Sequence, residues 1–215
     1  MGRKPSFSGQ KLSMSGQRTS VIWTRDKVAR FLAHALNPSF TTFFAIVALS
    51  ISAAERWILC ALWLAIGGAF TILLPFSYFL WLMRRGKISE LYIPARTQRT
   101  GPFLSLILFY TLGALLLRWI GAPSPAIAAL VVHTVNVALM TGVTCFCKMS
   151  FHVMSAATSG GILLYFFGTP GLLTLVLIAA ISWSRVHTRA HSLSQVLGGG
   201  LMGFFSALLQ LTAFL

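Results

Sequence analysis

Long apolar runs recur along this 215-residue chain and limit what it can fold into. Only 9% of its residues are charged and its mean hydropathy is +0.80, whereas about a quarter of the residues in soluble domains are charged. Runs of this length cross ~30 Å of hydrocarbon as helices, which satisfy their own backbone polar groups. The runs are continuous and do not alternate, which argues against a β-barrel. We therefore predict an all-α integral membrane protein.

Seven apolar segments are separated by turn signals such as Gly121-Ala122-Pro123. The first and the sixth are short, so we expect a bundle of six or seven transmembrane helices over residues 38–215. The expected segments are Ser39–Ala54, Trp57–Met83, Pro102–Ile120, Pro123–Cys147, His152–Phe167, Gly171–Trp183 and Leu193–Ala213.

Two shorter regions precede the bundle. Residues 1–20 are rich in Ser, Gly, Lys and Arg, which predicts a disordered basic tail. Residues 21–37 predict an amphipathic helix at the lipid interface, ended by Asn37-Pro38. Its expected apolar face holds Val28, Phe31, Leu32, Ala35 and Leu36. Its expected polar face holds Lys27, Arg30 and His34.

The net charge of +14 comes from 17 Lys and Arg against 3 Asp and Glu. Most of this charge lies in the N-terminal tail and in the short loops, so we expect anionic membrane lipids as partners and no nucleic acid. The positive-inside rule predicts that the basic face is cytoplasmic. The expected location is the cell inner membrane, with several passes. The oligomeric state stays open, a homo-oligomer included.

Alternation of the segments brings three basic clusters to one membrane face. The second, fourth and sixth segments end just before Lys87, at Lys148 and at Ser184. Because even-numbered ends share one side of a bilayer, these clusters should converge although they are far apart in sequence.

The stretch Ser184–Val196, SRVHTRAHSLSQV, carries the residues best suited to chemistry. Arg185 and His191 are six residues apart, and Gln195 follows the histidine by one helical turn. A guanidinium binds phosphate oxygens in a bidentate manner, and an imidazole acts as a nucleophile or a general acid. We predict a phosphate-handling site at this face.

These residues resemble the third signature of the type 2 phosphatidic acid phosphatase superfamily, Ser-Arg-x5-His-x3-Asp. Ser184, Arg185 and His191 match in identity and spacing, and Gln195 stands where the family has aspartate. The resemblance implies a metal-independent phosphatase of lipid phosphates that needs no cofactor. By position, His191 would be the nucleophile that forms a phosphohistidine.

Two earlier segments resemble the other signatures. Met149-Ser150-Phe151-His152 keeps the serine and histidine of Pro-Ser-Gly-His, and KISELYIPARTQRTGP loosely matches Lys-x6-Arg-Pro. The resemblance implies that His152 protonates the departing alcohol. The residues expected to bind the phosphate oxygens are Lys87, Arg96 or Arg99, Lys148, Ser150 and Arg185.

The expected substrate is phosphatidate, phosphatidylglycerol phosphate or a polyprenyl mono- or diphosphate. Gln195 could still accept a hydrogen bond from His191 and fix its tautomer, but it supplies no negative charge. A lipid phosphotransferase and a non-catalytic lipid-phosphate binding protein therefore stay open as alternatives. His133 and Asn136, in the middle of an apolar segment, are either functional or form interhelical hydrogen bonds.

Overall fold

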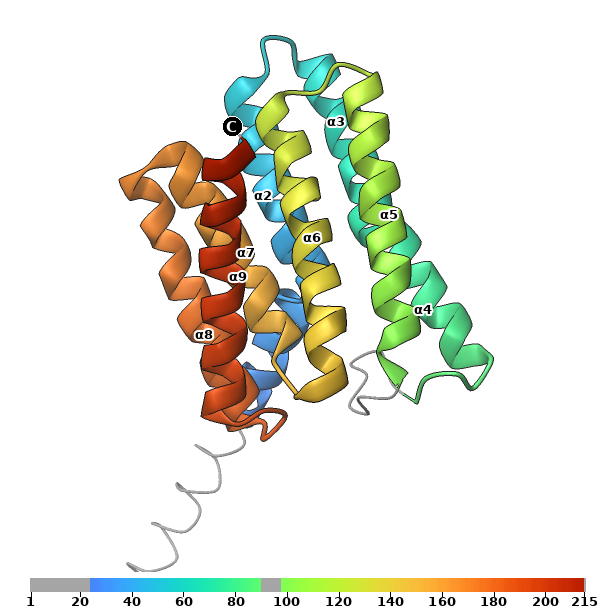
Figure 1. Cartoon of the computed structure of the whole chain (residues 1–215), viewed down its shortest axis with the longest axis vertical. Helices are drawn as coiled ribbons and strands as arrows, with labels where there is room; N and C mark the ends of the chain where they lie inside the picture. The colour runs from blue at the N-terminus through green and yellow to red at the C-terminus, as the bar shows by residue number, and fades with distance from the viewer. Residues whose placement is uncertain (1–23, 90–97, 215) are drawn as a thin grey trace, which may run out of the picture.

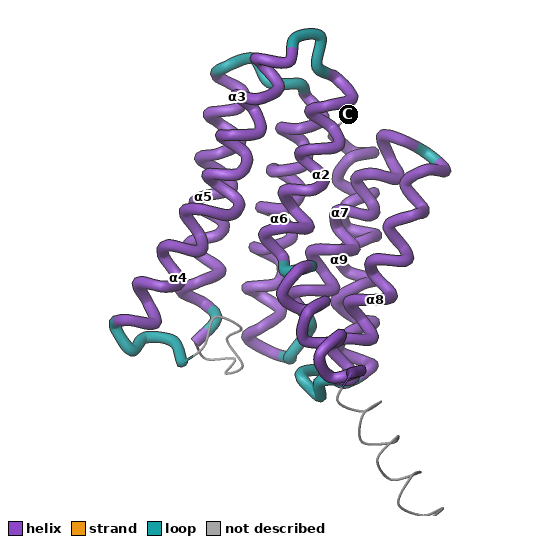
Figure 2. The backbone as a smooth tube through the Cα atoms, turned by 180° about the vertical axis from the view of Figure 1, so that it is seen from behind, coloured by secondary structure: helices purple, strands orange, loops and turns teal. Residues whose placement is uncertain are grey.

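A computed structural model describes residues 24–89 and 98–214, and helices are the only regular elements in these two ranges (Figure 2). A helix over Thr24–Ala35 comes first. The following elements are α2 (Pro38–Ala53), α3 (Trp57–Gly68), η1 (Ala69–Leu73), α4 (Leu74–Arg84), α5 (Thr100–Trp119), α6 (Ser124–Phe146), α7 (Phe151–Phe167), η3 (Thr169–Leu173), α8 (Thr174–His187) and α9 (Leu193–Phe214). All seven predicted apolar segments are helical.

Five of the described helical stretches are long and apolar enough to cross a membrane, and a bent pair could add a sixth. The bent pair is Thr24–Ala35 with α2, and the helices meet at 57°. Helix α7 is also apolar, but at 17 residues it is shorter than each of these five stretches. The five stretches are Trp57–Arg84, Thr100–Trp119, Ser124–Phe146, Thr169–His187 and Leu193–Ala213.

Helix α7 lies at the centre of the bundle, packed between α9, α8, α2 and α6, and α5 packs on α6 (Figure 1). Close approach of α7 and α9 depends on glycine. A Cβ added at Gly199 would lie 2.7 Å from the carbonyl oxygen of Ser150, and one at Gly161 would lie 2.9 Å from that of Phe204. The glycines of the last segment therefore do permit tight packing, as the sequence predicts.

Two polar side chains of α6 form hydrogen bonds inside the bundle. The ring of His133 lies 3.2 Å from the Thr42 hydroxyl through Nδ1 and 3.2 Å from the Ser159 hydroxyl through Nε2. Asn136 donates to the Thr158 hydroxyl at 2.8 Å and accepts from Ser206 and Gln210. Of the two readings that the sequence left open, the interhelical hydrogen bond is thus the one observed.

The long helical stretch over residues 57–84 contains a π-helical turn, η1, followed by Pro75. Proline has no backbone N–H to donate and its ring disturbs the preceding turn, so it fits beside such an irregularity. Thr71 donates to the Gly67 carbonyl at 2.7 Å, which satisfies one backbone acceptor there. Past this turn, α4 presents Phe76 and Phe79 to the cavity described below.

Asn37 defines the bend before α2. Its Oδ1 accepts from the Phe40 N–H at 3.1 Å, and its Nδ2 donates to the His34 carbonyl at 3.2 Å. One asparagine therefore caps the start of α2 and the end of the preceding helix, which confirms the predicted break at Asn37-Pro38. Residues 1–20, predicted to be disordered, lie outside the described residues.

The ends of α4, α6 and α8 lie at the same end of the bundle (Figure 1). This is the arrangement predicted from the alternating direction of the apolar segments, which puts the ends of the second, fourth and sixth on one side. The start of α7 and the start of α9 follow directly after two of these ends, so they lie at that end too.

Candidate functional site

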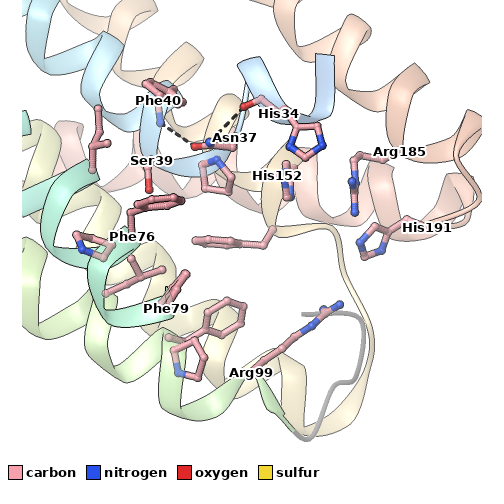
Figure 3. Close-up of a pocket in the computed structure, with 17 residues that line it drawn as sticks. His34, Asn37, Ser39, Phe40, Phe76, Phe79, Arg99, His152, Arg185 and His191 are labelled. Carbon is pink, nitrogen blue, oxygen red and sulfur yellow. Dashed lines mark hydrogen bonds between the residues drawn. The ribbon is translucent and has the colours of Figure 1, made fainter. Parts of the chain in front are cut away.

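A cavity of about 460 Å³ opens at this end of the bundle. Polar side chains gather on one part of its wall and apolar side chains on the rest (Figure 3). Of the described residues that line it, none is acidic. The charged and imidazole side chains in its wall are His34, Arg99, His152, Arg185 and His191.

A tight turn after α8 places His191 next to Arg185. The Arg185 carbonyl accepts from the N–H groups of Ala190 at 3.1 Å and His191 at 3.2 Å. The chain reverses at Arg189, whose φ of 54° is left-handed, as is usual just beyond a helix C-terminus. The six-residue spacing of the arginine and the histidine is therefore what lets one turn bring both to the cavity.

Gln195 holds His191. The Gln195 side-chain oxygen lies 3.0 Å from His191 Nδ1 and accepts from the Ser192 N–H at 3.3 Å. The Ser192 hydroxyl accepts from the Gln195 N–H at 3.3 Å. Serine and glutamine at this spacing form the reciprocal capping box that begins a helix. The predicted contact between Gln195 and His191 is confirmed, and the capping role is additional.

The same bonds fix the tautomer of His191. Because the Ser192 N–H can only donate, the Gln195 atom facing it must be the carbonyl oxygen, which can only accept. His191 Nδ1 must then carry the proton and donate it, which leaves a lone pair on Nε2. Burial, opposed by the Gln195 bond and reinforced by Arg185 and Lys148, lowers the pKa of His191 to about 4. The ring is therefore neutral at pH 7, as a nucleophile requires.

Helix α7 contributes His152, close to the residues of the α8–α9 turn. Arg185, His191, Arg99 and His34 are all near enough to act on its ring electrostatically. The Ser150 N–H donates to the Gln195 carbonyl at 3.1 Å, so the backbone joins the second sequence motif to the third. The Ser150 hydroxyl is buried, and no described residue forms a hydrogen bond with it.

Of the other predicted phosphate ligands, Arg99 lines the cavity. It is 7% exposed, and burial lowers the pKa of its guanidinium. Arg96, the alternative, lies outside the described residues. Lys87 is exposed and does not line the cavity, so the structure does not bring it to the site. Lys148 acts on His191 electrostatically without forming part of the wall.

His34 is the residue that the sequence reasoning missed. The sequence places it on the polar face of an interfacial helix, and in the structure its side chain also points into the cavity near His152 (Figure 3). The helix is buried against the bundle at its small residues, Ala29 and Ala33. Val28 and Phe31 stay 45% and 68% exposed. The available signal was the position of His34 just before Asn37-Pro38, on the face predicted for the site.

The remaining wall of the cavity is aromatic and aliphatic. Phe103 of α5 and Phe151 of α7 contact each other with ring centroids 4.9 Å apart. Phe40 and Phe76 are each about half exposed, at 46% and 50%. The site therefore combines a cationic wall with an apolar one. The other residues of the apolar wall are Ile72, Pro75, Phe79, Pro102 and Leu106.

No known family model, no curated protein and no solved structure matches this chain.

Proposed function

We propose that this protein is a membrane-embedded, metal-independent phosphatase that hydrolyses a lipid phosphate through a phosphohistidine on His191. The observation that carries the proposal is the meeting of His191, His152, Arg185 and Arg99 in one cavity that has no acidic lining residue. The resemblance of their motifs to the type 2 phosphatidic acid phosphatase superfamily supports it.

In the proposed reaction, His191 Nε2 attacks the phosphorus while Arg99 and Arg185 bind the non-bridging oxygens. The bond from phosphorus to the lipid oxygen breaks, and His152, which takes up a proton when the phosphate anion binds beside it, gives that proton to the lipid oxygen. Water then attacks the phosphohistidine, His152 accepts a proton from the water, and the N–P bond breaks. Phosphate leaves, and both histidines return to their starting states.

The mixed wall of the cavity favours a lipid substrate over a soluble phosphate ester. The cationic wall suits the phosphate group, and Phe76, Phe79 and Phe103 offer an apolar surface to a chain attached to it. We propose phosphatidate, phosphatidylglycerol phosphate or a polyprenyl mono- or diphosphate as the substrate. We also propose insertion in the cell inner membrane with the cavity facing the cytoplasm, since the helix Thr24–Ala35 and the basic end of α4 lie at the same end of the bundle.

The test is phosphate release by the purified protein in detergent–lipid micelles containing a chelator. We expect release from at least one lipid of this panel, its loss in His191→Ala, and its retention in Arg56→Ala, which removes an exposed charge at the opposite end of the bundle. An acid-labile phosphoryl label on the wild type that His191→Ala lacks would identify the phosphohistidine. Release that persists in His191→Ala would refute the mechanism.

One observation favours a second candidate, a non-catalytic lipid-phosphate binding protein. His191 is hydrogen-bonded to a neutral amide and lacks the carboxylate that would stabilise its charged form. This candidate predicts lipid-phosphate binding without release, and binding that survives His191→Ala. A phosphotransferase would instead pass the phosphoryl group to an added alcohol, which product analysis detects.

A further inference from the structure

The helix Thr24–Ala35 is fastened to α8 at the motif that carries Arg185. The Ser184 hydroxyl donates to the Ala29 carbonyl at 2.6 Å. His187 Nε2 donates to the Asp26 carboxylate at 2.8 Å. Ser184 is fully buried and Ala29 is too, so this contact excludes water. The helix is therefore held at the cavity by the residues on either side of Arg185.

This attachment determines where His34 lies. From Ala29, the next turn of the helix carries His34 to the rim of the cavity, where Figure 3 shows its ring beside His152 and Arg185. Asn37 fixes the backbone there by donating to the His34 carbonyl. The ring stays accessible, because His34 is exposed and still lines the cavity.

We propose that His34 is a further phosphate-binding residue and that the helix Thr24–Ala35 forms part of the site. An imidazole N–H donates to phosphate oxygens, and among the described residues of the wall none is acidic and two are arginines. Lys87, expected from the sequence to bind phosphate, does not line the cavity. His34 supplies a donor from a different element. This inference rests on the proposed function for its substrate, a lipid phosphate.

His34→Ala removes one hydrogen bond to a charged group, which corresponds to a roughly ten- to hundredfold weaker interaction. We expect KM for the lipid phosphate to rise by about that factor while kcat changes little, because the nucleophile and the acid are untouched. His34→Gln, which keeps an N–H donor, should recover part of the loss. The matched control is Arg30→Ala, which removes an exposed charge from the same helix without touching the cavity.

The attachment of the helix gives a second, independent readout. Asp26→Ala removes the acceptor of His187 and should raise KM in the same direction as His34→Ala. If the helix acts by positioning His34, the variant that combines Asp26→Ala with His34→Ala should have a KM no higher than that of His34→Ala alone. Full additivity of the two changes would show that the helix acts without His34.

Binding of inorganic phosphate to the full chain in micelles, followed by calorimetry, separates this inference from the proposed function. Weaker phosphate binding in His34→Ala and not in Arg30→Ala supports the site, even if no lipid is hydrolysed. Hydrolysis by the wild type with equal KM and phosphate affinity in His34→Ala overturns the role of His34 and leaves the phosphatase intact. Absence of both binding and hydrolysis in the wild type overturns both.

Discussion

Replacement of Gln195 by glutamate tests the central contact of the site. The Gln195 oxygen lies 3.0 Å from His191 Nδ1 and 3.3 Å from the Ser192 nitrogen. Glutamate has the same length and two acceptor oxygens, so Gln195→Glu keeps both bonds and adds a negative charge. A carboxylate is also favourable in the first turn of a helix, where α9 begins. We therefore expect the variant to fold as stably as the wild type.

The expected change is in the protonation of His191. Burial lowers the pKa of His191 to about 4. An opposite charge within hydrogen-bond reach raises the pKa of an imidazole, so the pKa of His191 should be higher in the variant than in the wild type. The same charge stabilises the cationic phosphohistidine. Loss of a comparable carboxylate in a serine protease costs about 10⁴ in turnover, which sets an upper bound on the gain here.

The pKa of His191 can be followed by NMR of the labelled imidazole during a pH titration, alongside phosphate release. We expect the resonance of Gln195→Glu to titrate at higher pH and its turnover to rise at pH 7. In Gln195→Leu, which has no hydrogen-bond acceptor at this position, both the pKa of His191 and the turnover at pH 7 should be lower than in the wild type. A folded Gln195→Glu variant whose His191 still titrates near the wild-type pKa would show that the bond does not govern this ring.

Four further outcomes are expected. Because the pKa of His191 falls from 6.5 in the unfolded chain to about 4 on folding, its contribution to stability is complete above pH 6.5 and is lost as pH falls towards 4, which thermal unfolding at several pH values would detect. Gly199→Ala should destabilise by about 1–3 kcal/mol, because its Cβ would lie 2.7 Å from the Ser150 carbonyl oxygen, whereas Gly200→Ala, at 3.4 Å from a side chain, should not. Asn136→Leu should cost about 1–2 kcal/mol in detergent unfolding through its lost interhelical bonds. Arg189→Gly should stabilise by roughly 1 kcal/mol by relieving the φ of 54°.

Sequence alone could predict the features of this chain that follow from the length of its apolar segments and from their alternating direction across the membrane. Length and hydropathy locate all seven apolar helices. Alternation of direction then places Arg185 and His152 at one end, because the rule needs only the number of crossings and not their packing. The sequence also predicts the contact of Gln195 with His191, although the structure forms it across the capping box at the start of α9 and not along one helix face.

The position of individual side chains could not be predicted in the same way. Whether Lys87 or Arg99 reaches the cavity depends on how the loop after α4 returns to α5, and hydropathy says nothing about that path. His34 enters the site because Ala29 and Ala33 let the helix approach α8 closely. The sequence pattern identifies the bulky apolar face, which this helix leaves exposed, but it does not identify the small residues through which the helix packs.

Two of the departures from the phosphatase signatures, Phe151 and Gln195, have a structural role in this chain. Phe151 contacts Phe103 in the apolar wall, and Gln195 closes the capping box that begins α9. Both residues are therefore compatible with the arrangement of the site.

In the proposed mechanism, a neutral partner at His191 stabilises the cationic phosphohistidine less than an aspartate would. Its formation then becomes the slow step and its hydrolysis the fast one, so the rate should depend on how readily the leaving oxygen departs. A site built in this way favours a phosphate with a good leaving group, and among the proposed substrates that is a lipid diphosphate.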